Sequence, residues 1–560
     1  MKNILLSCGI ALLIIVPTCC TKKIVTSNIP PAPRVVHNAH LPEGWYTHDP
    51  IKLNAEIDSY FACAAKEFTV AAAADRVRAL IVPHAGHYYS GLCAASAYQT
   101  LFEKKLTPTE SEIKPCKQIK NNSIKRVIIL APSHFAMLHG IALPPYTVYK
   151  TALGEISVDQ DALNILACSG QFRVVPEAHQ PEHSLEIQLP FLQKTVESFQ
   201  LVPLVIGRIL EENYVGILKQ LRKIIDETTL VVVSSDFVHH GADYDYKIFD
   251  TTIADNIRQL DSMALQAIFA QSFEHFSRYL QETSATICGR DPIKLLLALL
   301  ESETIKQVTP KLCCYYTSAH MEQARGAGSG NIINVNRLTE PLLDAHIQHS
   351  VSYAGIVFAQ EHKQDSAAAH SLTGYEKKAL LACARQTLKN VVKPSDQQLE
   401  DHLLRPIISP GAVQQSGAFV TLNAKDGSLR GCIGRITTPD PLFQTVMAMS
   451  YAAACLDTRF KPVQEHEVNN LVIDISILTP PHPVQSYQDI VIGTHGIILN
   501  KLDQTGVKMN SAVFLPQVPV EWKWDLQTTL EQLAQKSGLG KDGWKENCNF
   551  EVFEGFEIKE

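Results

Sequence analysis

Two histidines, an aspartate and a cysteine stand between residues 84 and 288 of this chain at positions where a binding site is expected. They are His84, His134, Asp236 and Cys288. The first three follow runs of four aliphatic residues at 79–82, 127–130 and 230–233. Continuous runs of this kind predict strands buried on both faces. Because ligands bind beyond the carboxyl ends of such strands in an open α/β sheet, we expect these side chains to meet at one sheet edge.

Cys288 precedes the apolar run 292–300, which predicts a helix, so the thiol is expected on the loop that enters this helix. Imidazole and thiolate groups bind transition metals, and the convergence of these residue types indicates a metal site. Arg290, two residues further on, is expected to lower the pKa of the thiol. The alternative is that the histidines are hydrogen-bonded structural groups and Cys288 is an inert buried thiol. The recurrence of the pattern at several strand ends favours the metal.

Two further groups offer acid–base chemistry. Asp236 and His239 lie three residues apart after a strand, and the spacing allows either one to bind metal or to act as a general base. The segment 182–190 predicts the start of a short helix in which His183 and Glu186 share a face. A carboxylate that supports a metal ligand, or a histidine that faces a substrate, would fit there. The alternative is a solvated helix end.

The strand-like segment 429–434 in the second half combines Arg430 and Cys432 with two glycines. A cysteine beside an arginine would be a reactive thiol or part of an anion pocket. The alternative, which the residues alone favour, is a core strand whose glycines let other backbone pack closely. The chain contains no phosphate loop, dinucleotide fingerprint, zinc ribbon or Gly-x-Ser-x-Gly nucleophile elbow.

The length of 560 residues predicts two or three domains. The net charge of -7, without basic blocks, argues against nucleic acid as a partner. Between 51 and 359 strand-like and helix-like runs alternate, which predicts an α/β domain. The polar segment 360–371 is the expected linker. The remainder, 372–560, carries an Asp-Gly hairpin signal and is predicted to be an α+β domain.

The N-terminus has the features of an export signal. Lys2 precedes the apolar run 4–16, which is too short for a membrane span and is followed by Cys19. Residues 1–23 are therefore expected to be a signal peptide of the bacterial lipoprotein type, with the protein attached to a membrane outside the cytoplasm through lipid on Cys19. Residues 24–50 are expected to be a spacer. A cytoplasmic protein with a misassigned start is the alternative, and the free thiols that the 14 cysteines indicate are unusual in an oxidising compartment.

Seven motifs of the first domain occur in the order typical of Memo-like proteins, and 51–358 resembles that family. The motifs are Pro83–Gly86 with Tyr89–Gly91, Ala131–His134, Thr151–Gly154, Glu182–Glu186, Ser234–Phe237, Ile287–Arg290 and Ser350–Gly355. The segment 371–560 resembles the AMMECR domain, and its matching motifs are Leu429–Gly434, Leu478–Pro481 and Phe514–Val518. The whole chain thus resembles a fusion of the B and A proteins of the AmmeMemoRadiSam system, in which a radical SAM protein accompanies both.

The Memo resemblance implies a fold similar to class III extradiol dioxygenases and a site for iron or copper. The implied metal ligands are His84, His134 and Cys288, and the catalytic candidates beside them are Asp236, His239, His183 and Glu186. Such oxygenases use two histidines and a carboxylate, so a cysteine in the set favours copper or another redox role. We therefore expect a metal-dependent oxidoreductase acting on a small molecule. The alternative is a non-catalytic metal-binding or peptide-binding adaptor that partners a radical SAM protein.

Overall fold

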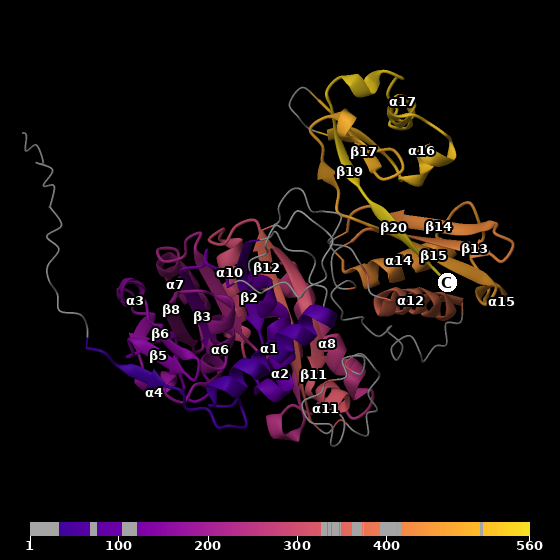
Figure 1. The fold of residues 1–560 in the computed structure, drawn as a ribbon. Helices are drawn as coiled ribbons and strands as arrows, with labels where there is room; N and C mark the ends of the chain where they lie inside the picture. Colours follow the sequence, from indigo (N-terminus) through magenta and orange to yellow (C-terminus); the bar gives the residue numbers. More distant parts are fainter. Residues whose placement is uncertain are drawn as a thin grey trace, which may run out of the picture.

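The computed structural model describes the chain as two parts with separate hydrophobic cores (Figure 1). The described residues are 33–67, 76–102, 120–325, 333, 338, 347, 349–360, 372, 374–392, 412, 416–438, 440–503 and 508–560. The expected signal peptide 1–23, the spacer up to residue 32 and the linker from 361 to 371 lie outside them. Within the described residues, no helix is both long and apolar enough to cross a membrane.

A mixed sheet of nine strands forms the centre of the first part, in the order β10-β12-β2-β9-β3-β8-β4-β7, with β11 paired to β12. Its strands are β2 (Arg76–Val82), β3 (Arg126–Pro132), β4 (Ile141–Leu143), β7 (Phe172–Val174), β8 (Gln200–Ile206), β9 (Thr229–Ser234), β10 (His239–His240), β11 (Thr309–Thr317) and β12 (Ser350–Gln360). A smaller sheet consists of β1 (Val36–Asn38), β5 (Val148–Thr151) and β6 (Gly154–Ser157). The three aliphatic runs that predict strands all lie in the large sheet, and the predicted α/β class is confirmed.

The helices of the first part connect these strands and cover the sheet (Figure 1). They are α1 (Pro50–Glu67), α2 (His87–Tyr98), α3 (Gln160–Leu166), α4 (Pro176–His179), α5 (His183–Glu186), α6 (Leu189–Thr195), α7 (Tyr214–Leu221), α8 (Ile253–Phe269), α9 (Phe273–Thr283), α10 (Arg290–Glu301) and α11 (Ser318–Arg325). Helix α10 begins two residues after Cys288, as predicted. α2 packs on β2, and α10 packs on β3 and β9.

The central strands bring their carboxyl ends to one edge of the sheet. β2 pairs in parallel with β9, and β9 pairs in parallel with β3. β3 and β9 are buried along almost their whole length, which requires cover on both faces of the sheet. Because the chain leaves these three neighbouring strands at the same edge, the segments that carry His84, Asp236 and His134 emerge side by side.

Residues 33–50 belong to the first part rather than to a spacer. β1 pairs in parallel with β5, and the side chains of Leu41 and Tyr46 are buried in the core of the large sheet. The physical reason is a set of long-range hydrogen bonds that the sequence does not indicate. The backbone N–H groups of His40 and Leu41 and the hydroxyl of Tyr46 all donate hydrogen bonds to the buried carboxylate of Glu186.

The second part contains two four-stranded sheets, in the orders β14-β13-β15-β20 and β16-β19-β17-β18. Its strands are β13 (Ala418–Ala424), β14 (Leu429–Arg435), β15 (Leu471–Leu478), β16 (His482–Pro483), β17 (Gly496–Leu502), β18 (Lys508–Phe514), β19 (Cys548–Phe553) and β20 (Gly555–Lys559). Its helices are α12 (Gly374–Val392), α14 (Leu442–Cys455), α15 (Glu465–Val468), α16 (Gln517–Glu521) and α17 (Leu526–Lys536). The antiparallel pairs confirm the predicted α+β class. Gly427 supplies the positive φ of 86° in the predicted hairpin turn between β13 and β14.

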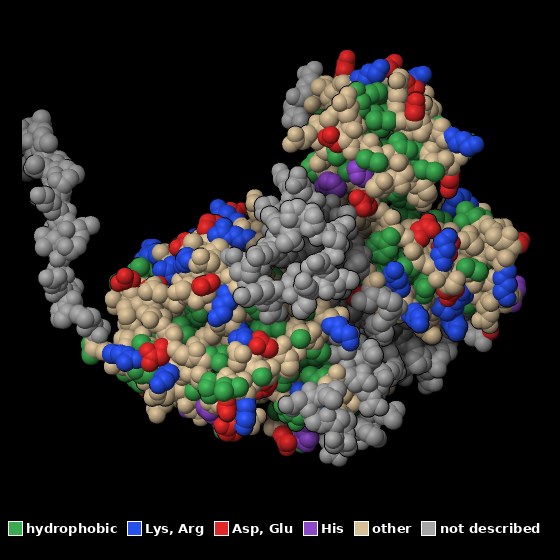
Figure 2. Space-filling view, in the orientation of Figure 1, with side chains coloured by type: hydrophobic (Ala, Val, Ile, Leu, Met, Phe, Trp, Pro, Cys, Tyr) green, Lys and Arg blue, Asp and Glu red, His purple; other side chains and the backbone are tan. Residues whose placement is uncertain are grey.

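The charged side chains of the described surface are mixed in sign. Figure 2 shows lysine and arginine interspersed with aspartate and glutamate on the face that it draws. A basic patch or stripe is the usual footprint of nucleic-acid binding. That nucleic acid is not the partner stays a prediction from the net charge of -7.

Candidate metal centre

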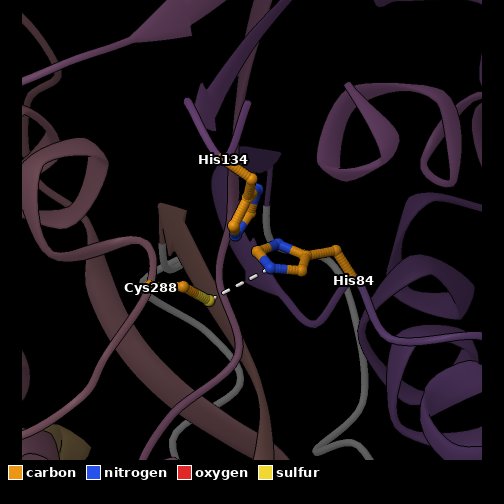
Figure 3. A group of neighbouring side chains, drawn as sticks. All are labelled: His84, His134 and Cys288. Carbon is orange, nitrogen blue, oxygen red and sulfur yellow. Dashed lines mark hydrogen bonds between the residues drawn. The ribbon is translucent and has the colours of Figure 1, made fainter. Parts of the chain in front are cut away.

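Three side chains from separate elements converge beyond the carboxyl ends of the central strands (Figure 3). Nε2 of His84 lies 3.1 Å from Sγ of Cys288, and the ring centroids of His84 and His134 are 5.1 Å apart. One ligand atom of each of the three residues lies within 4.8 Å of the others. His84 is buried, whereas 27% of the His134 side chain is exposed, so the group opens to solvent on the side of His134.

His134 is held by a buried carboxylate. Its backbone N–H and its Nδ1 lie 2.8 Å from the two carboxylate oxygens of Glu182. Burial alone would raise the pKa of Glu182, but hydrogen bonds from His134 and Ser184 lower it below its ordinary value, so the carboxylate is ionised. An ionised carboxylate only accepts hydrogen bonds. In the neutral form of the His134 ring the proton therefore sits on Nδ1, which leaves the lone pair of Nε2 free for a metal.

His239 is fixed in the same tautomer by backbone carbonyls. Its Nδ1 lies 2.8 Å from the carbonyl oxygen of Phe237 and 2.9 Å from that of Thr286. A carbonyl oxygen cannot donate, so Nδ1 carries the proton and Nε2 is free. The ligand atoms of His239, Asp236 and Cys288 form a second group within 4.8 Å, which shares its thiol with the first.

Asp236 is buried behind His84. One of its carboxylate oxygens accepts a hydrogen bond of 2.7 Å from the backbone N–H of His84, and the other lies 4.0 Å from Nε2 of the same residue. Burial raises the pKa of Asp236 to about 7, against the opposing effect of the backbone hydrogen bonds. A carboxyl group with this pKa exchanges protons near neutral pH, as a general acid or base must.

Burial also decides the charge of the other groups. It raises the pKa of the Cys288 thiol well above its ordinary value, and it lowers the pKa of His84 well below. The expectation that Arg290 lowers the pKa of the thiol is wrong, because the Arg290 side chain is 64% exposed and lies 3.9 Å from Asp291 instead. In the described part of the chain, no lysine or arginine forms an ion pair with Asp236 or Cys288. The site therefore holds the buried Asp236 and the half-buried Cys288 without a lysine or arginine to offset their ionisation.

His183 faces this group of ligands. Its ring centroid lies 4.4 Å from that of His134 and 4.7 Å from that of Trp45. Burial lowers the pKa of His183 to about 4, so its imidazole is neutral at physiological pH. Its Nδ1 is buried and lacks a hydrogen-bond partner, with the nearest Glu182 oxygen 3.6 Å away. Phe135, which is 60% exposed, lies beside the same ring at 5.8 Å.

Glu186 does not join His183 at the centre. Its carboxylate accepts hydrogen bonds from the backbone of 40–41 and from Tyr46, and it lies 2.5 Å from Nδ1 of His40. With His37 these residues form another group of metal-ligating types. The Glu186 oxygens already accept several hydrogen bonds there, and the group holds the N-terminal segment against α5.

Sequence reasoning missed Glu182 and Trp45, and also Ser234 and Gln188, which form hydrogen bonds beneath His84. One feature of the sequence indicated Glu182, because it stands directly before His183 at the start of a predicted helix, where the helix dipole favours a carboxylate. No such feature indicated the others, since their partners lie far away in the sequence.

In the second part, Arg430 and Cys432 have different partners. Arg430 forms two hydrogen bonds, of 2.8 and 3.0 Å, with the Glu467 carboxylate. The Thr421 hydroxyl donates to Sγ of Cys432 at 3.2 Å, and the Cys432 backbone N–H donates to Asp457. Within the described residues, every group of side chains with the types and spacing for a metal ion lies in the first part.

The candidate metal ligands fall inside the segment that comparison with known proteins identifies. The model of the family described as Memo-like protein matches residues 39–330. The chain belongs to the Memo-like family. The family model described as AMMECR1 matches residues 381–558, so both domains occur in one chain, as predicted.

The Memo-like part is similar to curated animal proteins. It is 34% identical to Protein MEMO1 of Xenopus tropicalis over 262 residues, which are 45% of this chain and 80% of that protein. It is 33% identical to Protein MEMO1 of Homo sapiens, with the same coverage, and 30% identical to Protein memo-1 homolog of Caenorhabditis elegans over 267 residues, 46% of this chain and 69% of that protein. The crystal structure of Uncharacterized Protein PH0010 from Pyrococcus horikoshii matches with 32% identity and a TM-score of 0.28, over 32% of this chain and 89% of that chain.

Replacing His84, His134 or Cys288 should remove the metal and leave the fold intact. The buried strands beneath the site supply the core, and each of these side chains supplies one ligand atom. The measurement is elemental analysis of purified His84→Ala, His134→Ala and Cys288→Ser proteins, with circular dichroism to check folding. Cys432→Ser is the matched control, because it removes a thiol from the other domain. Metal that disappears in Cys432→Ser and persists in Cys288→Ser would refute this placement.

The affinity for metal should fall as the pH is lowered through the neutral range. Coordination needs a thiolate, and the pKa of Cys288 lies well above its ordinary value, so binding releases the thiol proton. If binding releases one proton, the apparent affinity falls about tenfold for each unit by which the pH is lowered. Imidazole protonation adds to the loss only at lower pH, because burial lowers the pKa of His84. Competition titrations with a chelator over this range test the slope, and an affinity independent of pH would contradict it.

Proposed function

We propose that the Memo-like part is a redox protein that holds one iron or copper ion on Nε2 of His84, Nε2 of His134 and Sγ of Cys288. The observation that supports this most strongly is the orientation of the imidazoles. Glu182 turns the free nitrogen of His134 toward the other two ligands, and such carboxylate support is typical of metal-ligating histidines. A metal cation would also offset the charge of the buried thiolate.

The ligand set bears on which ion is bound. Two imidazoles with a thiolate form a softer set than the two histidines and one carboxylate of non-haem iron oxygenases. This favours copper over iron, and it favours electron transfer or oxidation over the ring cleavage that a class III extradiol dioxygenase performs. Three protein ligands leave positions for a substrate or for oxygen, and the exposure of His134 gives access to them. A bound ion would supply the redox chemistry.

The residues around the ligands are suited to hold and move protons. The neutral ring of His183 can accept a proton from a hydroxyl group placed near Trp45. Asp236, with a pKa near 7, can give or take one on the opposite side of His84. His239 offers a free Nε2 beside Asp236. Glu186 orders the segment that carries Trp45, and in this proposal it contributes to the site only through that segment.

We propose further that this chain, which includes the AMMECR1 domain, acts with a radical SAM protein of the same system. The resemblance of both halves to AmmeMemoRadiSam proteins supports it.

Turnover of a small molecule should depend on His84 and on bound metal. We expect protein loaded anaerobically with iron, or reconstituted with copper, to consume oxygen in the presence of catechols, and His84→Ala to lose that activity because it lacks a ligand. The measurement is an oxygen electrode trace with product analysis, with Cys432→Ser as the control. If the protein is fully loaded with metal and does not turn over catechols, a dioxygenase activity would be refuted, and the alternative of a non-catalytic adaptor would be favoured.

Membrane attachment should depend on Cys19. We propose that the protein is an exported lipoprotein, on the basis of the short apolar run 4–16 and the cysteine after it. One acyl chain binds a membrane only marginally, so the stable attachment expected here needs the several chains that bacterial lipoproteins carry. Fatty-acid labelling and fractionation of the wild type and Cys19→Ser test the idea. Unchanged fractionation of the variant would show that no lipid on this residue holds the protein.

A further inference from the structure

A buried hydrogen-bond chain lies beneath the metal ligands and ends on His84. Nδ1 of His84 lies 2.9 Å from the hydroxyl oxygen of Ser234, the last residue of β9. The same hydroxyl oxygen lies 2.6 Å from the carbonyl oxygen of Ser184 and 2.9 Å from Nε2 of Gln188. All four residues are buried, so no solvent competes with these contacts.

The direction of each bond follows from the far end of the chain. Nε2 of Gln188 also lies 3.0 Å from the carbonyl oxygen of Pro83, and the Tyr98 hydroxyl donates to Oε1 of Gln188 at 3.0 Å. Because a carbonyl only accepts, Gln188 presents its amide N–H groups to Pro83 and Ser234. The single hydroxyl proton of Ser234 goes to the Ser184 carbonyl. Toward His84, the serine oxygen can therefore only accept.

This arrangement decides between two competing positions for the ring proton. His84 has Ser234 on its Nδ1 side and Cys288 on its Nε2 side, at 2.9 and 3.1 Å. A proton on Nε2 would point at the thiol and block the ligand atom. It would also leave Nδ1 facing a serine oxygen whose proton is committed elsewhere.

We propose that Ser234, fixed by Ser184 and Gln188, is a positioning residue that keeps the proton of His84 on Nδ1 and leaves Nε2 as a permanent ligand atom. The inference rests on the proposed function only in assigning Nε2 of His84 to the metal. It also gives a role to the segment 182–190, since Glu182 orients His134 while Ser184 and Gln188 orient His84 through Ser234.

The test uses the full chain with ¹⁵N-labelled histidine, first without metal. Long-range ¹H–¹⁵N spectra distinguish the two tautomers, and His84→Gln identifies the signals of His84. The wild type should show a protonated Nδ1, whereas Ser234→Ala should show a mixture or a protonated Nε2. Ser234→Thr keeps the hydroxyl and should restore the wild-type pattern. Ser96→Ala is the matched control, because it removes another buried hydroxyl that donates to a carbonyl.

The second readout is binding of Co²⁺, followed through thiolate-to-metal absorption. Loss of a group that supports a metal-ligating histidine typically weakens binding about 10- to 100-fold, and we expect that loss in Ser234→Ala and not in Ser96→Ala. If Ser234→Ala does not fold, the same two measurements are made on Gln188→Met, which removes the amide N–H donor to Ser234. A wild-type tautomer together with wild-type Co²⁺ affinity in the deciding variant would overturn the proposal. Failure of the wild type to bind Co²⁺ would count against the proposed function instead, since the spectra of the metal-free protein are independent of it.

Discussion

The enclosure of the Cys288 thiol and the Asp236 carboxyl group without a lysine or arginine beside them is the constraint on which the site depends. Ionising either group in this partly closed position is costly, and their raised pKa values express that cost. A cation removes the penalty for both at once. The same burial lowers the pKa of His84 and so keeps its imidazole neutral, which is the state in which it binds metal. The packing that encloses these side chains therefore also tunes them as ligands.

That edge exists because three parallel strands end together. β2, β9 and β3 each run through the core and stop at the same level, and the loops that follow them carry His84, Asp236 and His134. Close approach of the Cys288 loop needs a glycine. A Cβ atom at Gly289 would lie 2.3 Å from Cβ of Ser235, so only a residue without a side chain lets the thiol reach its partners.

The sequence predicted the parts of this site that local patterns encode. Aliphatic runs marked β2, β3 and β9, and the residue types after them marked His84, His134 and Asp236. The helical run 292–300 marked the loop that carries Cys288. It did not predict what long-range packing decides. Nothing near residue 40 indicates that the segment docks on Glu186, and nothing near Arg290 shows that its guanidinium points to solvent. Hydrogen-bond partners about 50 to 150 residues apart leave no periodicity to read.

The support of two ligands by one short segment has a consequence for how the site can vary. Glu182 sets the orientation of His134, while Ser184 and Gln188 act on His84 through Ser234. The two imidazoles therefore share one mechanical support, and a shift of this single turn would rotate both. Relatives that retune the centre would be expected to change the segment and both ligand loops together, as one inherited unit, rather than one ligand at a time.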